Sequence, residues 1–210
     1  RNSSAASDVY KRQDQTPATL VSLATSAADQ TISVTYDSEM LESGSPASSA
    51  FTVRQGGAEL VVDSVTVSGA VVTLSVTGLA SGSLQVSYEA PGDAASAIQD
   101  DVGNLPVSFS QIVVSDGYIR GAEVYLDANG DGVAEVGELL SGVTSNSSGE
   151  ILLDGAAAVG ELIIKGGVNV DTGAVNELTM SAPAGYSVVN PLSTIVAEVI
   201  KASDPAVTPL

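Results

Sequence analysis

Short runs in which apolar and polar residues alternate, each closed by glycine, proline or small polar residues, fill most of this chain. Between residues 16 and 116 these runs are TISVTY from Thr31, AFTVR from Ala50, ELVVDSVTV from Glu59, AVVTLSV from Ala70, SLQVSY from Ser83 and VSFSQIVV from Val107. Alternation with a period of two indicates a strand with one buried face, and frequent turn residues are typical of antiparallel sheets. We therefore expect an Ig-like β-sandwich over residues 16–116.

A second set of runs, over residues 117–190, consists of YIRGAEVYL, ELLSGVT, EILLD, ELIIK and NELTM. The same pattern predicts a second, smaller sandwich, so the expected fold class is all-β with two sandwiches in tandem. A length of 210 residues allows two such cores. Val, Ala, Leu and Ile dominate the hydrophobic residues, with two Phe and no Trp, which suits strands packed through aliphatic side chains.

The two ends differ from this pattern. Residues 1–15 differ in composition from everything that follows, and we expect them to be a non-native leader or a linker outside the fold. Residues 191–210 are expected to form an amphipathic helix and a tail, with Asn190 as the cap and Pro191 in the first turn.

Apolar residues of the expected helix recur at the spacing of one helical face: Leu192, Ile195, Val196, Val199 and Ile200. A face of this kind needs a surface to cover. Two possibilities remain open from the sequence: the helix folds back on the second sandwich, or it belongs to a further helical unit.

Charge and missing residue types exclude several functions. The chain has 25 acidic and 7 basic residues and a formal net charge of −18, which repels nucleic acid and anionic membrane surfaces and attracts divalent cations. It contains no Cys and no His, so thiol chemistry and the usual general base are missing, and we expect no enzyme activity. No apolar run reaches the roughly 20 residues that span a bilayer, so we expect no membrane insertion.

The segment DANGDGVAEVGE, residues 127–138, matches the pattern D-x-[DN]-x-[DN]-G-x5-E of a twelve-residue calcium loop. Calcium takes about six to eight oxygen ligands, and a loop that curls around the ion presents alternate side chains inward. Gly132 permits the sharp turn that this requires. The expected ligands are the side chains of Asp127, Asn129 and Asp131, the backbone carbonyl of Val133, Glu135 directly or through water, and both carboxylate oxygens of Glu138.

The residues before this loop distinguish it from the loop of a helix–loop–helix calcium sensor. GAEVYL from Gly121 alternates like a strand, and no amphipathic helix precedes Asp127. We therefore expect the loop to join two strands, with the ion stabilising the folded state rather than opening a pair of helices. Two smaller oxygen clusters, at residues 37–39 and 100–104, are better explained as ordinary polar loops than as ion sites.

The run GAEVYLDANGDGVAEVGE with the following TSNSSGEILL resembles the calcium-binding B-type repeats (Sdr B-like) of bacterial surface adhesins, over residues 117–171. In those repeats a prealbumin-like sandwich carries the loop after its first strand. The second turn of that family has an Asp where this chain has Ser145, so the resemblance implies one ion rather than two. Residues 16–116, through TISVTYDSEM, ASSAFTV, SLQVSYEAP and AIQDDVGN, resemble the SWM-type repeat of giant cyanobacterial and marine surface proteins.

These resemblances imply a calcium-stabilised extracellular module of a large bacterial adhesin, secreted or at the cell surface, that serves as a spacer or presents a ligand-binding segment. Its implied partners are calcium and neighbouring repeat modules, and whether a surface glycan or protein is bound is left open. The alternative is a glycan-binding or accessory module of a secreted hydrolase. Sugar-binding modules usually stack aromatic rings on their ligands, whereas this chain has six scattered Tyr and no Trp.

Overall fold

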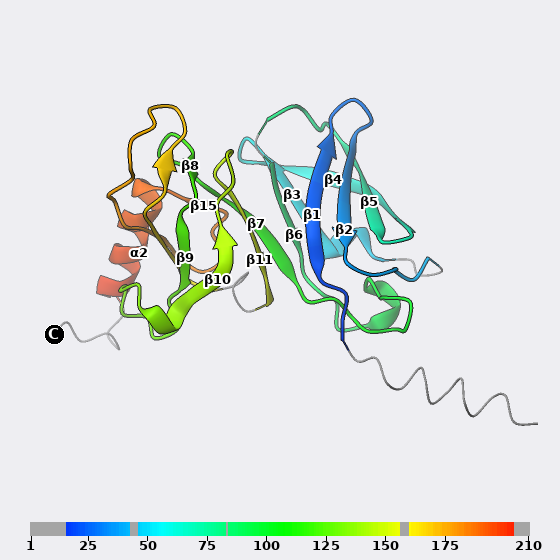
Figure 1. The fold of residues 1–210 in the computed structure, drawn as a ribbon. Helices are drawn as coiled ribbons and strands as arrows, with labels where there is room; N and C mark the ends of the chain where they lie inside the picture. Colours follow the sequence, from blue (N-terminus) through cyan, green and yellow to red (C-terminus); the bar gives the residue numbers. More distant parts are fainter. Residues whose placement is uncertain (1–15, 43–45, 83, 156–159, 204–210) are drawn as a thin grey trace, which may run out of the picture. The chain divides into compact units, whose positions relative to one another are not determined.

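The computed structural model describes residues 16–42, 46–82, 84–155 and 160–203. These residues form mostly β-strands, with one α-helix near the C-terminal end (Figure 1). The predicted all-β class with a short C-terminal helix is confirmed at this level. The chain divides into two compact units, residues 1–108 and 109–210. The expected leader, residues 1–15, and the expected tail, residues 204–210, lie outside the described residues.

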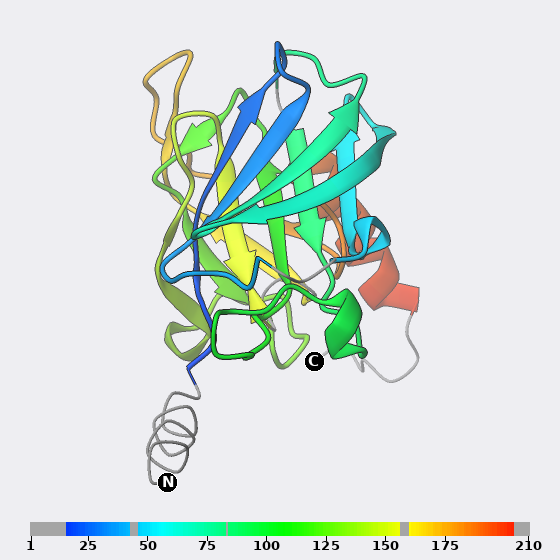
Figure 2. The ribbon, with the colours of Figure 1, turned by 90° about the vertical axis from the view of Figure 1, so that its right-hand side faces the viewer.

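In the first unit, hydrogen-bonded strands follow the order β1 (Leu20–Ser26), β2 (Thr31–Tyr36), β5 (Val71–Thr77), β4 (Ala58–Ser68), β3 (Phe51–Gln55) and β6 (Leu84–Tyr88). All these pairs are antiparallel. The long strand β4 pairs with β3 at its start and with β5 along the rest, with an irregularity between Val62 and Ser64 (Figure 2). Alternate residues of β2, β5 and β6 are buried, as the period of two predicts.

The division between the units falls after Ser108, whereas the sequence pattern placed it after residue 116. Within the second unit, the strand β7 (Phe109–Val114) pairs with β11 (Glu150–Asp154) and β15 (Val188–Val189). Alternation identifies a strand and its buried face but not its partners, which depend on contacts far away in sequence.

The second unit contains a four-stranded sheet in the order β10 (Leu139–Thr144), β9 (Glu123–Leu126), β12 (Leu162–Lys165) and β14 (Met180–Ala182). A short pair, β8 (Ile119–Arg120) and β13 (Val168–Asn169), lies outside that sheet. Side chains from β9, β12 and β14 share one buried cluster with side chains from β7 and β11. The core of this unit is therefore aliphatic, as the composition predicts.

Helix α2 (Pro191–Ser203) begins where the sequence predicts. The backbone N–H of Ser193 donates to Asn190 Oδ1 at 2.8 Å, and the N–H of Asn190 donates to Ser193 Oγ at 2.9 Å, so the first turn is capped on both sides. The helix packs on β14 and β15. Its 13 residues are too few to span a membrane, and no other described helix is long and apolar enough to do so.

Helix α2 packs by a face other than its apolar stripe. Ser193 and Ala197 are buried, and the hydroxyls of Ser193 and Thr194 bond to the carbonyl and the N–H of Ser181 at 2.7 and 2.9 Å. The apolar stripe is exposed: Leu192 (71%), Ile195 (59%), Val196 (36%), Val199 (60%) and Ile200 (50%). Of the two possibilities left open by the sequence, the helix does fold back on the second unit, but its apolar stripe is not the face that packs there.

The edge of the four-stranded sheet explains why α2 buries the face that carries Ser193 and Ala197. Strand β14 ends the order of its sheet, so among the described residues one side of its backbone has no hydrogen-bonded neighbouring strand. The hydroxyls of Ser193 and Thr194 satisfy both backbone groups of Ser181 there, and small side chains let the helix approach closely. The buried face of α2 is thus chosen by hydrogen bonds and size rather than by hydrophobicity.

Candidate metal centre

The loop of residues 127–138 joins β9 to β10, whose residues Tyr125 and Leu139 pair across its base. A short 3-10 helix, Val136–Glu138, closes it. The expectation that the loop lies between strands is confirmed, since no α-helix flanks it on either side. Gly130 and Gly132 have φ values of +77° and +78°, in the left-handed region that favours glycine, as the turn at Gly132 requires.

Asp127 anchors the start of the loop. Its side chain is fully buried. Oδ1 accepts a hydrogen bond from the N–H of Gly130 at 2.8 Å, and Oδ2 accepts one from the N–H of Gly132 at 2.9 Å. Two backbone amides of the loop therefore point at one carboxylate, and they curl the chain around it.

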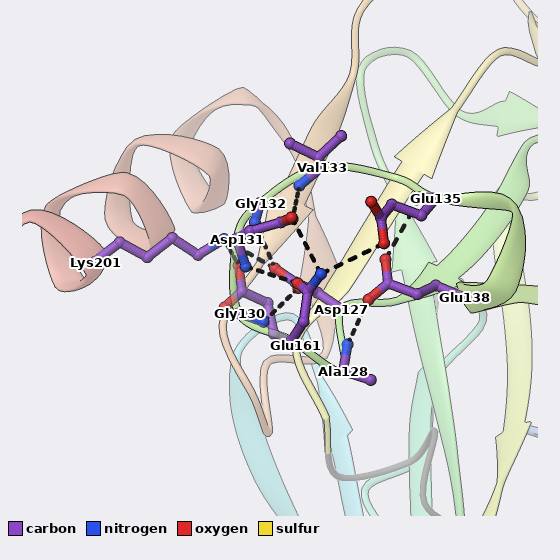
Figure 3. A network of polar contacts seen from close by, with 11 residues as sticks. Asp127, Ala128, Gly130, Asp131, Gly132, Val133, Glu135, Glu138, Glu161 and Lys201 are labelled. Atoms are coloured by element: carbon purple, nitrogen blue, oxygen red, sulfur yellow. Dashed lines mark hydrogen bonds and ion pairs between the residues drawn. The ribbon is translucent and has the colours of Figure 1, made fainter. Parts of the chain in front are cut away.

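The next side chains continue this curl (Figure 3). Asn129 Oδ1 accepts from the N–H of Asp131 at 2.9 Å, and Asp131 Oδ1 accepts from the N–H of Val133 at 2.7 Å. The amide nitrogen of Asn129 donates to Asp131 Oδ2 at 3.1 Å and to Glu135 Oε2 at 3.4 Å. Asn129, Asp131 and Glu135 are exposed, so solvent ions can reach them.

Glu138 ties the end of the loop to its beginning. Its Oε1 accepts from the N–H of Ala128 at 2.9 Å, and its Oε2 accepts from the N–H of Glu135 at 3.5 Å. The N–H of Glu138 in turn donates to the carbonyl of Glu135 at 3.0 Å. The structure thus gathers five predicted ligand side chains, those of Asp127, Asn129, Asp131, Glu135 and Glu138, into one hydrogen-bonded loop (Figure 3).

Two residues at this loop were not predicted. Lys201, in the last turn of α2, places Nζ 3.0 Å from Asp127 Oδ2 and 2.7 Å from Glu161 Oε1. Its side chain is only 14% exposed, and that of Glu161 is 20% exposed. The backbone N–H of Asp127 also donates to the carbonyl of Glu161 at 3.0 Å. A buried carboxylate at the loop is therefore paired with an ammonium group from a distant helix.

The pKa values of the pair reflect this contact. Burial acts to raise the pKa of Asp127, but the hydrogen bonds from Lys201, Gly132 and Gly130 outweigh it and lower that pKa. Burial acts to lower the pKa of Lys201, but the hydrogen bonds to Glu161 and Asp127 outweigh it and raise that pKa. Both groups are thus held in their charged forms near neutral pH.

The donor set fits calcium in its chemistry. Every predicted ligand offers oxygen, from carboxylates, one amide side chain and one carbonyl, which are the ligands that this hard cation prefers. Among the described residues, however, no group of three or more acidic side chains is arranged to hold a metal ion as it stands. Ligation would therefore require the loop carboxylates to turn from their present partners.

The two smaller oxygen clusters serve their own loops. Asp100 is buried, and its carboxylate accepts from the N–H groups of Val102 and Asn104 and from the side-chain amide of Asn104. Asp37 accepts from the hydroxyl of Thr19 at 2.5 Å and its N–H at 2.8 Å, and these bonds lower the pKa of that carboxyl.

One feature of the sequence could have indicated Lys201. Ser193, Ala197 and Lys201 recur at positions i, i+4 and i+8, which places two small residues and a lysine on one face of the helix. Small residues on a helix favour close packing, and a lysine in line with them would then be drawn toward a carboxylate. Glu161 carries no comparable signal.

Comparison with known proteins identifies no relative: no protein family, curated protein or solved structure matches this chain. The function of the loop has therefore to be argued from its own residues and their geometry.

Proposed function

We propose that this chain is a calcium-stabilised extracellular module of a large bacterial surface adhesin, built of two β-sandwich units and acting as a spacer or as a ligand-presenting segment. The observation that carries the proposal is the loop of residues 127–138. Its sequence has the spacing of a calcium loop, and its acidic and amide side chains bond to the backbone amides of the loop itself.

Electrostatics supports calcium as the ligand. Asp127, Asp131, Glu135 and Glu138 place four carboxylates within twelve residues, in a chain whose formal net charge is −18. Of these four, Asp127 is the one paired with a lysine in the described structure. Because like charges repel at short range, a divalent cation held by this loop would stabilise it. The carbonyl of Val133 and the amide oxygen of Asn129 would complete the set without adding charge.

The position of the loop supports a structural role for the ion. The loop directly follows β9, whose residue Val124 is fully buried, and its end leads into β10. An ion that binds the folded loop better than the unfolded one adds stability by mass action. Extracellular calcium modules have dissociation constants of roughly 10⁻⁴ to 10⁻³ M, so such a site is filled outside the cell and empty inside it.

A spacer role agrees with the other features of the chain. Its strongly negative charge disfavours nucleic acid and anionic membranes as partners. For the alternative, a glycan-binding module, exposed aromatic rings are needed. Tyr36, Tyr88 and Tyr125 are buried, which leaves Tyr118 and Tyr186 among the described tyrosines for such a surface.

The proposal is tested by thermal unfolding in calcium and in chelator. We expect calcium at ten times its dissociation constant to stabilise the protein by about 1.4 kcal/mol, with a matching rise in Tm. Asp131→Ala should abolish the rise, because it removes a loop carboxylate, and its direct effect on folding should be small because Asp131 is exposed.

The matched control is Asp171→Ala, which removes an exposed carboxylate of the same unit outside the loop. This variant should keep the full response to calcium, which separates a specific site from general screening of the negative charge. Identical melting of the unchanged protein in calcium and in chelator would contradict the proposal.

A further inference from the structure

We propose that Lys201 is a tethered cation that competes with calcium for Asp127, so that the docking of the end of α2 sets the calcium affinity of the loop. The inference rests on the proposed function and concerns the regulation of the same site. It starts from one geometric fact: the ammonium group of Lys201 lies 3.0 Å from Oδ2 of the first residue of the loop (Figure 3).

The approach of Lys201 to the loop is close and specific. A Cβ atom built on Gly132 would lie 2.8 Å from Lys201 Nζ, so the ammonium group fills the space beside this glycine. Asp127 Oδ2 already accepts from the N–H of Gly132 at 2.9 Å, and Lys201 is its second donor. The ammonium group of Lys201 therefore contacts the loop at two residues, Asp127 and Gly132.

Charge makes the two cations rivals. Calcium bound through Asp127 would bring two positive charges close to the ammonium group, in a place where the carboxylate is fully buried and the lysine nearly so. Like charges at such a distance repel strongly when water is largely excluded. Before calcium arrives, the same lysine gives the buried carboxylate of Asp127 the partner that such a group needs.

Lys201 has a partner to which it can withdraw. Glu161 Oε1 lies 2.7 Å from Nζ, closer than Asp127, and the four-carbon stem of lysine is flexible. The first half of α2 is held independently, through the bonds of Ser193 and Thr194 to Ser181. Exchange of Lys201 for calcium at Asp127 therefore loosens the last turn of the helix without releasing the helix.

The coupling is reciprocal by thermodynamic necessity: if Lys201 weakens calcium binding, calcium weakens the hold of Lys201 on the loop by the same factor. Two measurable consequences follow. Neutralising Lys201 raises calcium affinity, and calcium speeds amide hydrogen exchange in residues 199–203 without speeding it in residues 193–197.

The test is isothermal titration of calcium into the full chain. Lys201→Met should lower the dissociation constant by about 5- to 150-fold, the range typical of coupled binding events. Lys201→Arg keeps the charge and should bind calcium no more tightly than the unchanged protein. The matched control is Lys165→Met, which removes a lysine of the same unit whose ammonium group lies over the ring of Tyr125 rather than beside Asp127.

A second neutral variant, Lys201→Gln, should raise affinity as Lys201→Met does and serves if the methionine variant fails to fold. Equal or weaker calcium binding by the folded neutral variants overturns the inference and leaves the proposed function standing. An equal gain in Lys165→Met also overturns it, because the effect is then one of net charge. Binding by the neutral variants alone supports the inference and overturns the proposed function.

Absence of calcium binding in every form up to about 10 mM, well above the usual range for extracellular modules, overturns both proposals. Hydrogen exchange supplies the independent measurement. Faster exchange of residues 199–203 in calcium, seen in the unchanged protein and lost in Lys201→Met, supports competition. Slower exchange there would show that calcium and Lys201 bind together, and it overturns the inference.

Discussion

At the residue scale, Gly132 has two functions that coincide. Its φ of +78° lies where a side chain is strained, which is the reason that the calcium-loop pattern requires glycine at this position. The structure adds a second reason, because a Cβ here would meet the ammonium group of Lys201. Gly130 shares the first property, with a φ of +77°, but has nothing within 4 Å of its Cβ position. An alanine at residue 130 therefore tests backbone strain alone, whereas an alanine at residue 132 tests backbone strain together with displacement of Lys201.

We predict that in chelator Gly132→Ala destabilises the protein more than Gly130→Ala. Left-handed backbone strain should cost each variant about 1–2 kcal/mol. Gly132→Ala should cost more than this, by less than the roughly 1.5–3 kcal/mol of a hydrogen bond to a charged group, because the ammonium group of Lys201 has to shift but is the far end of a flexible side chain. Urea denaturation measures both costs.

The same comparison in a Lys201→Met background isolates the contact. With the lysine removed, the two alanine variants should cost the same, since only backbone strain remains. A difference that persists in that background would show that something other than Lys201 makes Gly132 special.

The candidate ligands could be predicted from sequence because they lie within twelve consecutive residues, so a loop pattern contains all of them. For Lys201 the sequence offers only the spacing of Ser193, Ala197 and Lys201 along one helical face, and for Glu161 it offers no signal. Lys201 is 74 positions from Asp127, and its contact depends on which face of α2 is buried. Local spacing can place Lys201 on a helical face, but it does not identify Asp127 as the partner, because tertiary packing creates that pairing.

At the scale of elements, periodicity predicted the positions of most strands and of the helix in the sequence. It did not predict which elements and which faces pack together. The predicted runs at residues 31–36, 50–54 and 70–76 correspond to the strands β2, β3 and β5, shifted by at most one residue. Strand β1 was not predicted, because no residue in it is fully buried and its sequence shows no regular alternation. The partners of β7 and the buried face of α2 both depended on neighbours distant in sequence.

Helix α2 gives the clearest test at this scale. We predict that Ala197→Leu destabilises the second unit by about 1–3 kcal/mol, because Ala197 is buried and a larger side chain would overpack its contact with the sheet. Ile195→Ala should change stability by less than about 0.5 kcal/mol, since Ile195 is already 59% exposed.

Chemical denaturation of the two variants provides the measurement. Circular dichroism should show that both keep their helix, so that the difference reports packing rather than helix formation. If Ile195→Ala proved the more costly change, the apolar stripe would be the buried face in solution, and the hydroxyl contacts with Ser181 would not determine the orientation of α2.

At the scale of the whole molecule, the candidate site belongs to one of the two units. The loop and its ion pair lie within residues 109–210, whose core cluster contains residues of that unit alone. The first unit has its own core, with the rings of Phe51 and Tyr88 5.0 Å apart at its centre. Ligand binding to one cooperative unit reduces the opening of that unit and need not affect another.

We predict that calcium protects the two units unequally from hydrogen exchange. Some amides exchange only when the whole second unit opens. Calcium at ten times its dissociation constant should slow this exchange about tenfold, and the amides of β9 and β12 provide the measurement. Exchange at β2 and β5 of the first unit should not change. Asp131→Ala should remove the protection of β9 and β12, while Asp171→Ala should keep it. Equal protection of all four strands would mean that the two units unfold together, and calcium would then stabilise the module as a whole rather than the unit that carries the loop.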